Sequence, residues 1–139
     1  MNYKYAIISG FLGQLKDRFK FYQKPRDLEE KFQLVKKVKG ASGLELVYPY
    51  DFAELDKTKS LLAKYDLQVG AVNVDIKGEH YWDKRALTAG DTDTRKKAIE
   101  YIRKGAELSR DLGVNLVSVC PLQDGYDYHF EVDYEEVWN

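Results

Sequence analysis

Cysteine and proline are scarce in this 139-residue sequence, which contains one cysteine and three prolines. The single cysteine, Cys120, has no second thiol with which to form an internal disulfide or a metal site of the usual spacing. A protein with so little cysteine suits a reducing compartment, so we expect it to be cytoplasmic. With 44% hydrophobic and 32% charged residues, the composition also excludes low-complexity, collagen-like and disordered classes. One globular domain of ordinary size remains.

The sequence also lacks an excess of charge of either sign and any long apolar run. Its 22 Lys and Arg residues nearly balance 23 Asp and Glu residues, for a formal net charge of −1. Such a chain has no overall field that would attract nucleic acid or an anionic membrane, and we expect neither as a partner. No window approaches the roughly 18 apolar residues of a membrane helix. The apolar stretch 6–12 is too short for a signal peptide, so we expect a soluble protein that is not exported.

Short apolar runs alternate with amphipathic stretches along the chain. They predict strands at residues 3–10, 44–48, 67–76 and 114–120, and helices at 27–39, 52–65 and 91–112. Asp27 and Glu30 have the spacing of a capping box at the start of the first helix. A further helix is expected to begin after Asp133. Strands that alternate with helices indicate an α/β fold with a parallel sheet and right-handed crossovers.

Two connections differ from the short loops that usually join strands and helices. Residues 11–26 are expected to form a polar, aromatic loop. Residues 77–91 form a loop of about fifteen residues, whereas most strand-to-helix loops have about two to six. Loops of that length are often functional.

The main competitor is a doubly wound nucleotide-binding domain, which places a glycine-rich phosphate loop after its first strand. The corresponding segment here, residues 9–14, reads SGFLGQ and contains neither G-x-G-x-x-G nor G-x-x-x-x-G-K-[ST]. Periodicity alone does not separate an open sheet from a closed barrel.

Four segments at the strand ends and helix starts point to one family. They are residues 43–46 (GLEL), 69–75 (VGAVNVD), 87–99 and 112–128. Together they resemble the sugar phosphate isomerase/epimerase, or xylose-isomerase-like, family of TIM barrels over nearly the whole chain. The resemblance implies that residues 1–139 are the N-terminal half of a (β/α)₈ barrel, with four strands and three to four helices, truncated within the fourth helix. A complete barrel takes about 250 residues.

The resemblance also implies a chemistry for the complete parent protein. Relatives shift a proton next to the carbonyl of a small sugar, using carboxylates and a divalent cation, usually Mn²⁺, Mg²⁺ or Co²⁺. Their metal ligands come from strands five to eight, and this sequence has no positions that match them. We therefore expect this chain to bind no metal and to be inactive by itself.

In this barrel class the active site lies at the C-terminal ends of the strands. We predict that the chain contributes the wall of a pocket for a small sugar or sugar phosphate, through Tyr48, Asn73, Asp75, Trp82 and His129. Further candidates at strand ends are Phe11, Tyr50, His80, Asp124, Asp127 and Tyr128. The alternative for Asn73 and Asp75 is that they satisfy loop amides, and a lone histidine is more often solvated than functional.

Two further residues have structural interpretations. Glu45 lies in the middle of a strand and must be paired or protonated if it faces the barrel interior, which favours a structural network over catalysis. Cys120 has no base near it in the sequence, so we expect it to pack as a small hydrophobic residue.

Two other functions remain open. A non-catalytic half-barrel could bind a partner, or form a homo-oligomer through its open sheet edges. A barrel endonuclease for damaged DNA is the third possibility, but its early strands typically end in histidines, whereas these end in 73–75 (NVD) and 120–121 (CP).

Overall fold

The computed structural model describes residues 3–16, 20–77, 79–82, 85–121, 124, 130 and 132–135. Its main sheet has four parallel strands in the order β1-β4-β5-β6. The strands are β1 (Tyr5–Ile8), β4 (Ala41–Tyr48), β5 (Gln68–Val74) and β6 (Val117–Val119). Three helices follow the first three of these strands: α1 (Leu28–Lys37), α2 (Leu55–Tyr65) and α3 (Thr92–Asp111).

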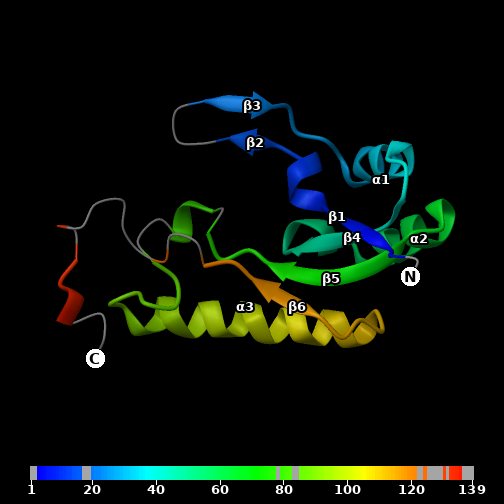
Figure 1. Cartoon of the computed structure of the whole chain (residues 1–139). Helices are drawn as coiled ribbons and strands as arrows, with labels where there is room; N and C mark the ends of the chain where they lie inside the picture. Colours follow the sequence, from blue (N-terminus) through cyan, green and yellow to red (C-terminus); the bar gives the residue numbers. More distant parts are fainter. Residues whose placement is uncertain are drawn as a thin grey trace.

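The order of strands in the sheet is the same as their order in the chain. A doubly wound domain would reverse direction from its first strand, whereas a barrel adds each strand on the same side. Figure 1 shows α3 lying lengthwise beside β5 and β6, as the outer helix of a barrel does. The chain therefore has an α/β fold that is half of a TIM barrel, as the sequence predicts.

Local sequence signals explain where the helices begin. Glu30 N donates to Asp27 Oδ1 at 2.8 Å, and Asp27 N donates to Glu30 Oε2 at 2.9 Å, so the predicted capping box is present. Asp91 caps α3 by accepting hydrogen bonds from the backbone N–H groups of Asp93 and Thr94. These bonds satisfy N–H groups that have no partner within the helix.

The connection between β1 and α1 differs from the loop that the sequence predicts. Residues 11–26 are not a simple loop, because they contain the end of a 3₁₀ helix, η1 (Ser9–Leu12), and a hairpin of β2 (Leu15–Lys16) and β3 (Phe21–Gln23). Strands of two and three residues are too short to show an alternating pattern in the sequence. A second 3₁₀ helix, η2 (Tyr50–Phe52), similarly delays the start of α2 to Leu55, and a third, η3 (His80–Trp82), lies in the long loop.

The core lies between the sheet and the helices. Leu44 and Leu46 of β4 are fully buried against Phe32 and Val35 of α1. A second cluster packs Val74, Ile76, Trp82, Ala86 and Ala98 under α3. Because side chains alternate along a strand, residues between these core positions point to the opposite face, which is the interior face of a barrel. None of the helices in the described part of the chain has the length and apolar character needed to cross a membrane.

Candidate functional site

A row of polar side chains crosses the interior face of the sheet. Glu45 of β4 accepts two hydrogen bonds at Oε1, from Asn73 Nδ2 at 2.7 Å and from Ser118 Oγ at 2.6 Å. The three residues come from three neighbouring strands, with Asn73 directly opposite Ser118. The expectation that an interior Glu45 must be paired is confirmed. Ser118 was not among the predicted site residues. Its place between Val117 and Val119 nevertheless puts it on the face opposite that apolar pair.

Two further polar residues lie where β4 and β5 end. Asp75 N donates to Tyr48 O at 2.9 Å, and Asp75 Oδ1 accepts from Lys77 N at 3.0 Å. Burial raises the pKa of Tyr50, and the negative charges of Asp75 and Glu79 and a hydrogen bond to Asp75 raise it further. Asp75 thus satisfies a loop amide and also holds the Tyr50 phenol in its neutral, donating form. The loop-amide interpretation of Asp75 is confirmed, and its pocket role stays a prediction.

Tyr48 and Trp82 lie on the other side of the sheet, under α3. Tyr48 shares the side-chain direction of Leu44 and Leu46, and its ring centroid is 5.3 Å from that of Tyr101. Trp82 is 3% exposed, and its ring also lies 5.3 Å from Tyr101. The structure therefore brings these two residues together through Tyr101 but separates them from the Glu45 row. Their pocket role stays a prediction, and their surroundings support packing.

The remaining candidates lie in separate parts of the chain. Phe11 is exposed on η1, directly after β1. Asp124 accepts hydrogen bonds from the backbone N–H groups of Ala86 and Thr88, so its carboxylate holds the loop before α3. His80 begins η3. Cys120 is half-buried, whereas His129, Asp127 and Tyr128 lie outside the described residues.

A buried ionic cluster at the ends of β1 and β4 has no counterpart in the sequence analysis. The Asp51 carboxylate accepts hydrogen bonds from Lys31 Nζ at 2.8 Å, from Val47 N at 2.7 Å and from the Ser9 hydroxyl. Lys31 lies one position before Phe32 on the core side of α1. That placement could have indicated from the sequence that Lys31 is buried. All three groups are buried and mutually satisfied, so the cluster joins elements rather than binding a ligand.

The acidic side chains do not form a metal centre within the part of the chain that the structure describes. No group of three or more His, Cys, Asp or Glu residues there could hold a metal ion. Asp51, Glu45 and Asp124 each make hydrogen bonds to other protein groups. These residues do not fit the divalent cation that the family resemblance implies, and no chemistry is assigned to a metal on this chain.

Comparison with known proteins supports the architecture. The sequence model of the xylose isomerase-like TIM barrel family matches residues 32–139, from within α1 to the last residue. No curated protein matches the chain. The matched region contains three of the four strands of the parallel half-barrel and most of its helical cover. On both grounds, the chain belongs to the xylose isomerase-like TIM barrel family.

Proposed function

We propose that this chain forms the substrate-binding N-terminal half of a sugar or sugar phosphate isomerase/epimerase barrel. The parent reaction moves a proton next to the carbonyl of a small sugar. This chain binds and orients the sugar, while the residues that transfer the proton belong to the remaining strands. The chain by itself is then inactive.

The polar row of Glu45, Asn73 and Ser118 is the observation that carries this proposal. Interior positions of such barrels are usually occupied by branched apolar side chains, yet here a carboxylate, an amide and a hydroxyl cross three strands. Both internal hydrogen bonds go to Glu45 Oε1, so Oε2 can accept a bond from a sugar hydroxyl. Sites built to hold hydroxyls use a few such fixed polar groups.

Tyr50 and Asp75 extend this polar surface to the edge where ligands of the fold bind. Tyr50 follows β4 and Asp75 follows β5, so both lie at the C-terminal ends of their strands. The Tyr50 phenol is protonated at neutral pH, as an ordinary tyrosine is, and partial burial and the nearby carboxylates raise its pKa further. Because its single O–H donates to Asp75, the Tyr50 oxygen can accept a hydrogen bond from a sugar hydroxyl, and the Asp75 carboxylate can accept another.

A titration of the ¹⁵N-labelled 139-residue chain with D-fructose tests this proposal. Resonances of Asn73, including its side-chain amide, and of Glu45 and Ser118 should shift. Glu45→Gln should weaken binding about tenfold or more, because a hydrogen bond to a charged group contributes about 1.5–3 kcal/mol. Glu107→Gln, on the exposed side of α3, is the matched control. An unmoved Asn73 amide at high sugar concentration would refute the proposal.

A second candidate function is a half-barrel that pairs with another copy of itself. β1 and β6 are the outer strands of the four-stranded sheet, and Tyr3 and Tyr5 are exposed at the start of β1. Open edges and exposed aromatic side chains favour association. Light scattering on the same sample distinguishes a dimer from a monomer.

A further inference from the structure

The segment that contains the β2–β3 hairpin has a net positive charge, whereas the rest of the chain has more acidic than basic residues. Residues 14–26 contain five Lys or Arg residues and one Asp, in a chain whose formal net charge is −1. Three aromatic residues, Phe19, Phe21 and Tyr22, are interleaved with these basic residues. Local charge of one sign attracts a ligand of the other sign even where the whole molecule is nearly neutral.

The hairpin belongs to the side of the fold where substrates bind. It lies within the connection from β1 to α1, and so follows the C-terminal end of β1. Figure 1 shows it projecting on the side to which the arrowheads of β5 and β6 point. Loops at this end of the strands build the active sites of (β/α)₈ barrels.

Hydrogen bonds hold the base of the hairpin in place. Gln23 Nε2 donates to Phe11 O at 3.2 Å and also to Gly13 O. Arg26 Nη1 donates to Leu12 O at 2.9 Å. These bonds attach β3 and the residues after it to η1, so that the hairpin is a positioned part of the fold.

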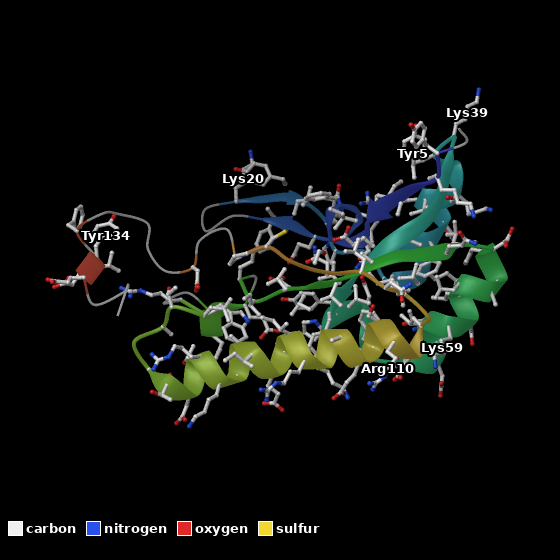
Figure 2. All side chains as sticks on the ribbon, turned by 60° about the horizontal axis from the view of Figure 1, so that its bottom comes forward. Tyr5, Lys20, Lys39, Lys59, Arg110 and Tyr134 are labelled. Carbon is white, nitrogen blue, oxygen red and sulfur yellow. The ribbon has the colours of Figure 1, made fainter. Side chains whose placement is uncertain are left out.

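The hairpin carries an open depression of about 470 Å³, which is within the range of small-ligand sites, about 300–1,000 Å³. Its lining residues are Gln14, Phe21, Tyr22, Gln23, Lys24 and Pro25. Phe21 and Tyr22 are 67% and 64% exposed, and the Lys20 ammonium lies 5.9 Å from the centre of the Tyr22 ring. Figure 2 shows Lys20 on the hairpin, pointing away from the sheet.

We infer that the hairpin binds the anionic group of an anionic sugar, a phosphate or a carboxylate, and so selects charged over neutral sugars. The exposed aromatic rings can stack on the C–H face of a sugar, and the lysine ammonium groups bind the anion as point charges. Among the described residues, no carboxylate forms an ion pair with Lys24. The inference rests on the proposed function, whose substrate class it narrows.

The experiment uses the labelled full chain and compares five probes: D-fructose 6-phosphate, D-gluconate, D-fructose, inorganic phosphate and a (dT)₁₀ oligonucleotide. D-Fructose 6-phosphate should shift the resonances of Tyr22 and Lys24 and bind about tenfold more tightly than D-fructose, since bonds between charged groups are the stronger ones. Raising the salt concentration should reduce that preference. Binding of D-gluconate as well identifies any anionic sugar as the ligand, and its failure to bind identifies a phosphorylated one.

Two double variants test the residues. Lys20→Gln/Lys24→Gln should remove most of the preference for D-fructose 6-phosphate over D-fructose. Lys39→Gln/Lys59→Gln changes the net charge equally at two exposed sites away from the hairpin (Figure 2) and should keep the preference. Circular dichroism checks that both variants fold.

Several outcomes would overturn the inference. They are equal affinity for D-fructose and its phosphate, a preference that survives loss of both lysines, inorganic phosphate binding as tightly as the sugar phosphate, or hairpin resonance shifts caused by the (dT)₁₀ oligonucleotide and by no sugar.

The sugar site on the sheet and the anion site on the hairpin fail under different results. If sugars shift Asn73 without regard to charge, only the hairpin inference fails. If D-fructose 6-phosphate shifts Tyr22 and Lys24 but no sugar shifts Asn73, only the proposed sugar site on the sheet fails.

Discussion

Lys31 and Asp51 form a buried ion pair in which Nζ lies 2.8 Å from Oδ1 and the side chains are 11% and 1% exposed. The pair joins α1 to η2, at the end of β4. Asp51 also accepts hydrogen bonds from Val47 N and the Ser9 hydroxyl, and its backbone carbonyl accepts one from Thr58 Oγ1 at 2.6 Å. Asp51 therefore connects η1, α1 and β4 through its carboxylate, and α2 through its backbone carbonyl.

Removing the Asp51 charge should destabilise the fold severely. Asp51→Asn leaves the Lys31 ammonium buried without a counter-ion, which costs about 3–5 kcal/mol. Urea unfolding measures this loss. Glu107→Gln, which makes the same chemical change in the exposed pair with Lys104, should shift the unfolding midpoint by no more than the experimental error. Similar losses of unfolding free energy in the two variants would show that burial does not increase the contribution of the Lys31–Asp51 pair to stability.

The replacement of Trp82 distinguishes packing from sugar binding. Trp82 contacts the rings of Tyr81 and Tyr101, with centroid distances of 4.8 and 5.3 Å. Trp82→Ala should cost about 3–5 kcal/mol of unfolding free energy, the range for truncating a buried aromatic residue. Phe21→Ala removes an exposed ring and should change stability by no more than about 0.5 kcal/mol. A stable Trp82→Ala protein that binds sugar poorly would favour the pocket role instead.

Gly105 marks the closest approach of α3 to the sheet. A methyl group at this position would overlap the Val74 side chain, so Gly105→Ala should destabilise by about 1–3 kcal/mol despite the better helix propensity of alanine. Nothing lies within 4 Å of the corresponding position at Gly90. Gly90→Ala is therefore the matched control and should be nearly neutral in thermal unfolding. An increase in stability on Gly105→Ala would mean that α3 can move away from Val74 without a loss of packing energy.

The cap of α3 predicts a specific pH dependence. Asp91 accepts hydrogen bonds from Thr94 N at 2.8 Å and Asp93 N at 3.1 Å, and its bonds with Thr94, followed by that from Asp93 N, lower its pKa below the usual 3.8. A carboxyl group whose pKa is lower in the folded state stabilises the fold above its unfolded pKa. This contribution disappears as the pH falls through the lowered value.

Asp91→Ala should therefore unfold more easily than the native chain at pH 7, and the difference between their urea midpoints should shrink below pH 3.8. Asp91→Asn retains a capping oxygen but does not titrate, so the difference between the urea midpoints of Asp91→Asn and Asp91→Ala should not change with the ionisation of Asp91. A difference between native and Asp91→Ala proteins that is constant from pH 7 to strongly acidic pH would contradict the role of the charge.

Much of the fold could be predicted because its signals are local. The Asp27–Glu30 capping box, the amphipathic stripe of α1 and the valine-rich β5 each depend on residues close together in the chain. The alternation of these elements then indicates a parallel sheet. The β2–β3 hairpin escaped prediction because its paired residues are few, and pairing across such short strands leaves no periodic pattern.

The candidate site was predicted less completely, because it depends on which face each side chain occupies. Asn73 and Tyr48 both lie near the C-terminal ends of strands, and the sequence placed both on a pocket wall. The structure places Asn73 beside Glu45 and Tyr48 beside Tyr101. A shift of one residue along a strand reverses the face to which a side chain points.

The sequence by itself determined the class of fold, the helix caps and the need for Glu45 to be paired, since propensity, periodicity and the cost of a buried charge act locally. Only the tertiary structure decided the partners: Asn73 and Ser118 for Glu45, Lys31 and Ser9 for Asp51, and Tyr101 for Trp82. Most of these pairs join residues more than 25 positions apart, and strand register and helix packing bring them within hydrogen-bond distance only after the chain has folded.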